Sequence, residues 1–138
     1  MKTVFVFGTF DGLHPGHEAF LRDARALGDA LTVSIAQDEI VVRLKHRPPL
    51  QTLAVRLRQI EQSPYVTKVI PGDLEIGTYH GFKAEKPNIV AFGYDQTELL
   101  KDFTRFQTAV GDETEVVVLK PFHPETYKSS LLRGQANV

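Results

Sequence analysis

The sequence contains no cysteine among its 138 residues. That absence excludes thiolate nucleophiles, cysteine-based zinc sites and disulfide frameworks, and it is compatible with a reducing compartment. Folding must then depend on a hydrophobic core, which a chain of this length can build because roughly two-thirds of its unfolded surface can be buried. We therefore expect one globular domain over residues 1–138, without a structural metal or disulfide.

An excess of charge of one sign and long apolar runs are also lacking. The formal net charge is −1 at pH 7, which argues against a generally basic nucleic-acid binder and makes any anion site local. No apolar run approaches the roughly 20 residues of a membrane span, and residues 1–7 lead into a strand pattern without a secretory signal. We expect a soluble cytoplasmic protein with no membrane or nucleic-acid partner.

Short β-branched and aromatic runs alternate with segments of helical periodicity. Residues 4–7, which precede Gly8, have the pattern of a strand buried on both faces, and further strands are expected at residues 31–36, 66–70, 89–92 and 115–119. Helices are expected over residues 15–27 and around Leu53, Leu57 and Ile60, with Thr52 as N-cap. This alternation predicts an α/β fold, a Rossmann-like doubly wound five-stranded parallel sheet with helices on both faces and ligands outside the carboxyl ends of its strands.

The segment from Gly8 to His17 connects the first expected strand to the first expected helix. Its backbone amides and the helix start can face an anion. His14 and His17 bracket the first helical turn, and Gly16 between them leaves room for backbone or phosphate to approach. The spacing matches neither a Walker loop nor the dinucleotide glycine turn. It predicts a nucleotide-phosphate site that both imidazoles address.

Basic residues are concentrated in the middle of the chain. Residues 41–59 include no Asp or Glu and five cations, namely Arg43, Lys45, Arg47, Arg56 and Arg58. This imbalance indicates a local anion site. A solvated loop and helix surface is the other explanation, and it suits Arg43 and Arg58 best.

Several motifs carry a resemblance to a known family. Gly8-Thr9-Phe10-Asp11 followed by His14-Pro15-Gly16-His17 resembles the signature of the cytidylyltransferase-like nucleotidyltransferases. Residues 36–39, 45–49 and 56–57 are similar to the middle of glycerol-3-phosphate cytidylyltransferases and archaeal FAD synthases, and residues 91–96 resemble the latter more closely. Residues 128–133 resemble a degraded form of the family's Ser/Thr motif for the β- and γ-phosphates.

The resemblance implies an enzyme that transfers a nucleoside monophosphate from a nucleoside triphosphate to a phosphorylated acceptor and releases pyrophosphate. The leading pair is ATP and FMN, which gives FAD. CTP with glycerol 3-phosphate, phosphocholine or phosphoethanolamine is the alternative, and a non-catalytic nucleotide-binding regulatory module is an alternative of another class. Mg²⁺ would be bound through the triphosphate, with no metal ligands from the protein, and we expect a homodimer.

Residue roles follow from matching these motifs to the chain. The catalytic residues are predicted to be His14, His17 and Lys45. The nucleotide-binding residues are predicted to be Gly8, Thr9, Phe10, Gly16, Gly93, Asp95, Lys128, Ser129 and Ser130. The residues predicted to bind the acceptor are Asp11, Asp38 and Arg56. Near the end, His123 stands about where the family's cytidylyltransferases carry an arginine, so Lys128 and His123 would supply positive charge there.

Some of these residues have a structural alternative. Asp11 could accept backbone N–H groups and thereby cap the loop, and Asp95 could be an ordinary turn former. An aromatic group could line an acceptor pocket or belong to the core, and its members are Tyr79, His80, Phe82, Phe103 and Phe106.

Overall fold

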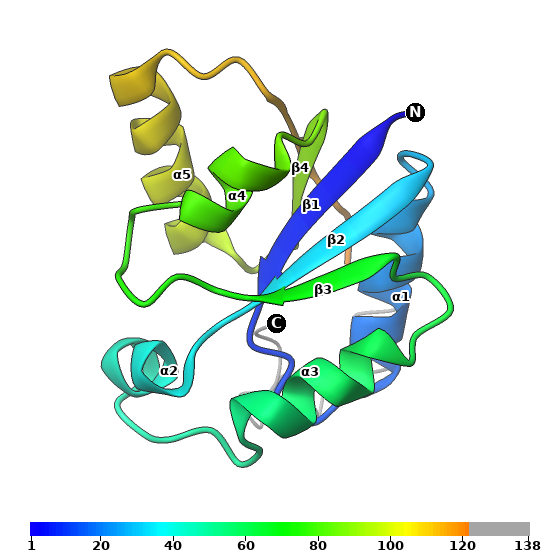
Figure 1. Cartoon of the computed structure of the whole chain (residues 1–138), viewed down its shortest axis with the longest axis vertical. Coiled ribbons are helices and arrows are strands. Elements are labelled where there is room, and N and C mark those ends of the chain that lie inside the picture. Colours follow the sequence, from blue (N-terminus) through cyan, green and yellow to red (C-terminus); the bar gives the residue numbers. More distant parts are fainter. Residues whose placement is uncertain (122–138) are drawn as a thin grey trace.

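In this computed structural model, which describes residues 1–121, five parallel strands form one sheet (Figure 1). The strands are β1 (Thr3–Gly8), β2 (Ala30–Ile35), β3 (Lys68–Pro71), β4 (Ile89–Phe92) and β5 (Glu115–Val118). Their order is β3-β2-β1-β4-β5, and each neighbouring pair is parallel. The chain therefore builds outward from β1 in one direction and then in the other, which confirms the predicted doubly wound sheet.

Helices cover both faces of this sheet. They are α1 (Pro15–Arg25), α2 (Asp38–Lys45), α3 (Leu53–Glu61), α4 (His80–Glu85) and α5 (Thr97–Val110). On one face, α1 and α3 bury Leu21 and Ile60 against the sheet, and on the other face α4 and α5 bury Phe82 and Phe103. Helix α2 follows β2 directly and lies beyond the carboxyl ends of the strands (Figure 1). Both faces of β1 are thus covered, which explains why its central residues are fully buried.

Helices α1 and α3 agree with the predicted positions, whereas α2, α4 and α5 were not predicted. Helix α1 starts at residue 15 as expected and ends at Arg25, two residues early. Helix α3 begins after Thr52, whose hydroxyl accepts a hydrogen bond from the Val55 amide at 3.4 Å, so the predicted N-cap is confirmed. Helices α2 and α4 have only eight and six residues, too few for a clear helical period in the sequence.

The aromatic residues of α4 and α5 belong to the core. The exposed fractions of Phe82 and Phe103 are 4% and 0%, and the Phe82 ring meets both Phe5 of β1 and Phe103 edge-on. Tyr79 is also buried, and its hydroxyl donates a hydrogen bond to the Asp102 carboxylate at 2.5 Å. Of the two explanations for this group, the core explanation is confirmed for the phenylalanines that are buried here.

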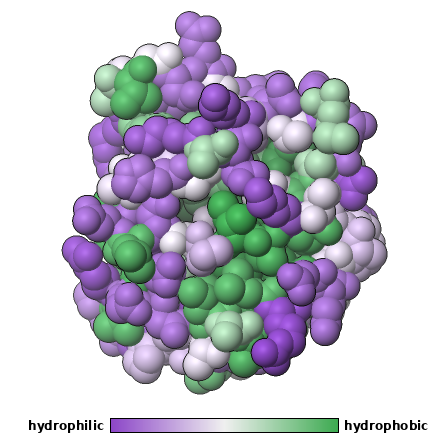
Figure 2. Space-filling model, in the orientation of Figure 1, coloured by the Kyte–Doolittle hydropathy of each residue, from purple (hydrophilic) through white to green (hydrophobic). Residues whose placement is uncertain are grey.

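The surface is polar over most of the face in Figure 2, and apolar residues reach it over β3 and α3. Strand β3 is an edge strand, and its last residue is Pro71, which lacks an N–H group and so limits further pairing at this edge. Within residues 1–121, no helix is both long enough and apolar enough to cross a membrane.

Candidate active site

The loop between β1 and α1 lies at the carboxyl edge of the sheet and has an unusual backbone. Phe10 adopts a left-handed conformation with φ of +52°, and its ring is 1% exposed. That ring lies over Gly8, where an added Cβ would come within 2.4 Å of it. A side chain at position 8 would therefore expel the ring and reshape the loop.

The imidazoles of His14 and His17 are stacked at the start of α1. Their ring centroids are 3.8 Å apart, and the Phe10 ring meets His17 edge-on at 5.4 Å. His14 Nδ1 accepts a hydrogen bond from the Gly16 amide at 3.0 Å, and His17 Nδ1 accepts one from the His14 amide at 3.3 Å. Because both Nδ1 atoms are acceptors, each neutral ring carries its proton on Nε2. The loop thus prepares two Nε2–H donors on one helix start.

The residue between the two histidines is glycine for a steric reason. A Cβ at Gly16 would stand 2.8 Å from Cε1 of His14, closer than such atoms approach. Glycine therefore lets the His14 ring lie flat over its own helix turn and accept the Gly16 amide. Helix α1 also points its N-terminal end at this loop, which favours negative charge. The pair and the helix end together can bind an anion.

Asp11 joins the loop to the segment before α3. Its two carboxylate oxygens accept hydrogen bonds from the Leu50 amide at 2.7 Å and the Gln51 amide at 2.9 Å. Gln51 in turn accepts the Gly12 amide through Oε1 at 3.1 Å. The geometry matches the capping explanation of Asp11, and its predicted contact with the acceptor stays a prediction.

Arg56 is a buried guanidinium with protein partners on most of its N–H groups. It is 0% exposed, and Nη1 donates to the carbonyls of Thr9 and Ala36 at 3.0 and 2.8 Å. Nε donates to the Gln51 carbonyl at 3.0 Å, and Nη2 donates to Asp38 at 2.5 Å. Arg56 therefore ties the loop after β1 to the segments before α2 and α3. The structure pairs Arg56 and Asp38 with each other, and acceptor binding by them stays a prediction.

Two carboxylates that follow different strands, Asp11 after β1 and Asp95 after β4, act electrostatically on Lys45. It is half-buried in the last turn of α2, and burial and the Arg47 charge lower its pKa, while Asp11 and Asp95 oppose the shift. Burial raises the pKa of Asp95, and the Lys45 ammonium partly offsets this effect. Oδ2 of Asp95 is buried and accepts no hydrogen bond from the described residues. Such an oxygen is available to an N–H or O–H donor of a ligand.

The turn after β4 is braced against β1 by a glutamine that is not among the predicted site residues. Gln96 accepts the Gly93 amide through Oε1 at 2.8 Å and donates from Nε2 to the Phe7 carbonyl at 2.9 Å. This bridge holds Asp95 beside the end of β1. In the sequence, Gln96 is a polar residue three positions after the glycine that follows β4, and this pattern is too common to identify its role.

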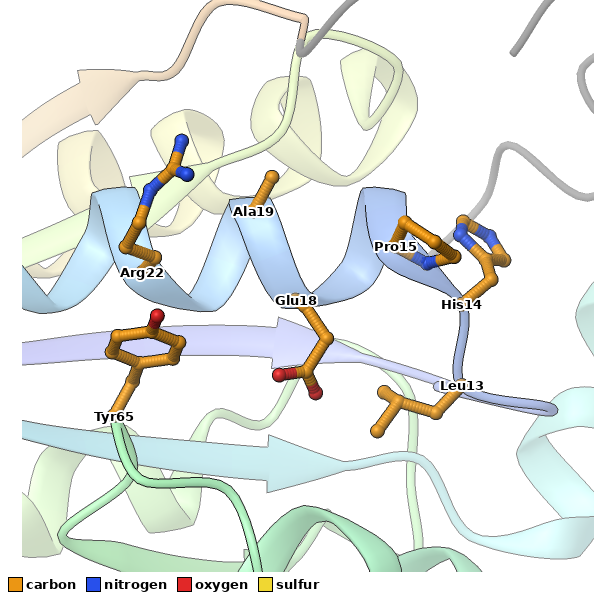
Figure 3. A pocket seen from close by; sticks show the side chains of 7 residues that line it. All are labelled: Leu13, His14, Pro15, Glu18, Ala19, Arg22 and Tyr65. Atoms are coloured by element: carbon orange, nitrogen blue, oxygen red, sulfur yellow. The ribbon is translucent and has the colours of Figure 1, made fainter.

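A shallow hollow runs along the outside of α1 from His14 to Tyr65 (Figure 3). It is lined by Leu13, His14, Pro15, Glu18, Ala19, Arg22 and Tyr65. Within residues 1–121, His14 is the one residue that the hollow shares with the predicted site. Of the other predicted residues, Lys128, Ser129 and Ser130, together with His123, lie outside the described residues.

Comparison with known proteins gives this arrangement a family. A family model described as cytidylyltransferase-like matches residues 5–135. An FAD synthase from Aciduliprofundum boonei is 37% identical over 122 residues, 88% of this chain and 80% of that protein. An FAD synthase from Methanosarcina mazei is 43% identical over 110 residues, 76% of this chain and 70% of that protein.

Solved structures agree on the fold. The lipopolysaccharide core biosynthesis protein of Thermoplasma volcanium superposes with a TM-score of 0.79 at 28% identity, over 88% of this chain and 98% of that one. Pantothenate synthetase from Thermus thermophilus gives 0.66 at 18% identity over 91% of this chain and 58% of its own length, which shows the fold alone.

The family decides between two of the predicted function classes. FAD synthases and a cytidylyltransferase-like family model match over most of the chain, so a non-catalytic regulatory module is not supported. Because one family model covers residues 5–135 and relatives above 30% identity are spanned for most of their length, the chain belongs to the cytidylyltransferase-like family and is a nucleotidyltransferase.

Proposed function

We propose that this nucleotidyltransferase is an FAD synthase, which transfers AMP from ATP to the phosphate of FMN and releases pyrophosphate. The observation that carries the proposal is the identity of 37% and 43% to two archaeal FAD synthases over most of the chain. The turn after β4 supports it, because residues 91–96 are the segment that resembles FAD synthases more than glycerol-3-phosphate cytidylyltransferases.

In this reaction an FMN phosphate oxygen attacks the α-phosphorus of ATP in line, and the bond to the leaving pyrophosphate breaks. Negative charge then increases on the α-phosphoryl oxygens and on the leaving group. His14 and His17 would donate from Nε2 to these oxygens, and their Nδ1 hydrogen bonds fix that tautomer beforehand. The acceptor phosphate is already ionised, so neither histidine has to remove a proton. Preorganised donors of this kind stabilise charge that develops in the transition state.

The remaining residues would position the two substrates. Thr9 and the Phe10 amide would orient the α-phosphate, and Gly8 and Gly16 leave room for the strained loop and for the His14 ring. Lys45, half-buried in the last turn of α2, would neutralise the moving charge. Asp95 would accept a hydrogen bond from the nucleotide through its buried Oδ2. Arg56 and Asp38 hold the loop in place through their ion pair and hydrogen bonds, and their contact with the acceptor stays a prediction.

Mg²⁺ belongs to the proposal as a partner of the triphosphate. As the family resemblance implies, Mg²⁺ would be bound through the triphosphate. There it would neutralise negative charge on the nucleotide. A homodimer and a cytoplasmic location stay predictions.

A matrix of substrates tests the proposed function. Pyrophosphate release is measured with ATP or CTP against FMN, glycerol 3-phosphate, phosphocholine, phosphoethanolamine and phosphopantetheine. We expect release with ATP and FMN, and FAD as the second product by chromatography. Riboflavin, which lacks the acceptor phosphate, is the matched negative control. Preference for CTP with a phosphorylated alcohol would instead make the chain a cytidylyltransferase.

A further inference from the structure

Strands β1 and β4 separate at the carboxyl edge of the sheet. Strand β1 pairs with β2 up to Gly8, but it pairs with β4 only up to Val6. In the order β3-β2-β1-β4-β5, this is the point where the sheet reverses its direction of growth (Figure 1). The chain after β1 enters α1 on one face of the sheet, and the chain after β4 enters α5 on the other face. Parallel α/β sheets bind ligands in the crevice that such a divergence leaves.

The side chain of Gln96 bridges the two strands where their backbone pairing has stopped. Its Oε1 accepts the Gly93 amide at 2.8 Å, and its Nε2 donates to the Phe7 carbonyl at 2.9 Å. Phe7 follows the last residue of β1 that pairs with β4, and Gly93 follows the last residue of β4. The main chain of Gln96 is fixed as well, since its amide donates to the Gly93 carbonyl at 3.1 Å and its carbonyl accepts the Leu100 amide at 3.0 Å. The planar side-chain amide, a donor at one end and an acceptor at the other, therefore sets the spacing of the strand ends.

Each end of this bridge belongs to one part of the proposed site. Phe7 is followed directly by Gly8, where the loop that carries the histidine pair begins. Gly93 is separated by one residue from Asp95, whose buried Oδ2 is proposed to accept a hydrogen bond from the nucleotide. The turn between them is compact, since a Cβ at Gly93 would come within 3.1 Å of Asp95 Oδ1 and 3.6 Å of Gln96 Oε1. A change at Gln96 would thus alter the separation between Asp95 and the histidine loop.

We infer that Gln96 is a positioning residue for nucleotidyl transfer, which sets the distance between the histidine loop after β1 and the Asp95 turn after β4. It acts through the backbone of Phe7 and Gly93 and contacts neither substrate. A nucleotide held at Asp95 then presents its α-phosphate to the donors of the loop in one register. The inference deepens the proposed function and rests on it for the roles of the loop and the turn, but it does not require the acceptor to be FMN.

The test compares Gln96→Met with Gln107→Met in the full chain. Gln107 is the matched control because it lies on α5, the helix that begins after Gln96, and its Nε2 donates to Asp112 at 2.9 Å and to the Thr114 carbonyl at 3.0 Å. That second brace precedes β5 and so lies at the opposite edge of the sheet. Both variants should lose similar stability in urea unfolding. Gln96→Met alone should lower kcat, by about 10- to 100-fold, because a displacement of about 1 Å between reacting groups has an effect of this size.

The comparison of kcat with KM separates positioning from binding. In Gln96→Met, kcat/KM for ATP should fall by the same factor as kcat, with KM unchanged, because the register matters in the transition state. Calorimetric titration with a non-hydrolysable ATP analogue should give the wild-type affinity. Gln96→Asn is a milder second variant, since it keeps the amide but is one methylene shorter and reaches only one of the two backbone groups. It should also lower kcat, and it decides the question if Gln96→Met does not fold.

Wild-type kcat in the folded Gln96 variants would overturn the inference. An equal loss of kcat in Gln107→Met would overturn it too, because the effect would then follow stability. A loss confined to the KM for ATP would instead make Gln96 a nucleotide contact. The substrate matrix of the wild-type enzyme tests the proposed function separately. If pyrophosphate is released with CTP and a phosphorylated alcohol, the proposed function fails, and the Gln96 comparison is made with that substrate pair.

Discussion

Replacing Arg56 with methionine should destabilise the fold more than it weakens triphosphate binding. The methionine keeps an apolar stem in a site that is 0% exposed, but the carbonyls of Thr9, Ala36 and Gln51 lose this donor and Asp38 loses its cation. Breaking a buried ion pair from one side costs about 3–5 kcal/mol. The Asp38 side chain is 40% exposed and can be solvated by water, so we expect the lower end, about 3 kcal/mol.

That loss is large compared with the total stability of a domain, which is about 5–15 kcal/mol. The variant should therefore fold at 25 °C but melt roughly 10 °C below the wild type. Urea unfolding followed by circular dichroism gives the free energy, and calorimetric titration with a non-hydrolysable ATP analogue gives the affinity. Arg58→Met is the matched control, because Arg58 is exposed on the same helix and its loss should change stability by less than about 0.5 kcal/mol.

A double substitution tests whether the ion pair is the cause. Asp38→Asn combined with Arg56→Met should cost less than the sum of the two single changes, because the two side chains act on one interaction. The reasoning is refuted if Arg56→Met unfolds at the wild-type urea concentration but binds the triphosphate analogue weakly. That result would show that the Arg56 guanidinium contacts the substrate, as the family resemblance implies.

Two further predictions concern the imidazoles and the lysine. His17→Ala should lower kcat by about 10²- to 10³-fold without changing the fold. The double variant with His14→Ala should lose less than the product of the two single effects on kcat. A His17→Ala enzyme with full turnover would exclude the assigned role. Burial and the Arg47 charge lower the Lys45 pKa below its ordinary 10.5, so kcat/KM should decline as the pH rises through that pKa and the ammonium is lost. Lys45→Arg stays charged and should remove this decline, and an identical pH profile would show that another group causes it.

The strand and helix order could be predicted from the sequence because its signals are local. A β-branched and aromatic run followed by glycine defines β1, and Thr52 marks the start of α3 through a hydrogen bond three residues ahead. The histidine pair is equally local, since Gly16 and both imidazoles lie within one helical turn. These features require no knowledge of the distant chain, so both the fold and the signature loop followed from the sequence alone.

Only the tertiary structure decided what the charged residues contact. Arg56 lies in a basic stretch of the sequence and there resembles a phosphate ligand. In the fold, the order of the strands brings the carbonyls of Thr9 and Ala36, which follow β1 and β2, to its guanidinium, and the spacing of residues in the sequence does not predict these contacts. Lys45 and Asp95 influence each other's pKa although they are far apart in the chain, because α2 and the turn after β4 both lie at the carboxyl edge of the sheet. The partner of a cation depends on which strand ends are neighbours and on how deeply the cation is buried. Both the neighbours and the burial result from packing between segments that are distant in the sequence, and neither segment's sequence identifies the other.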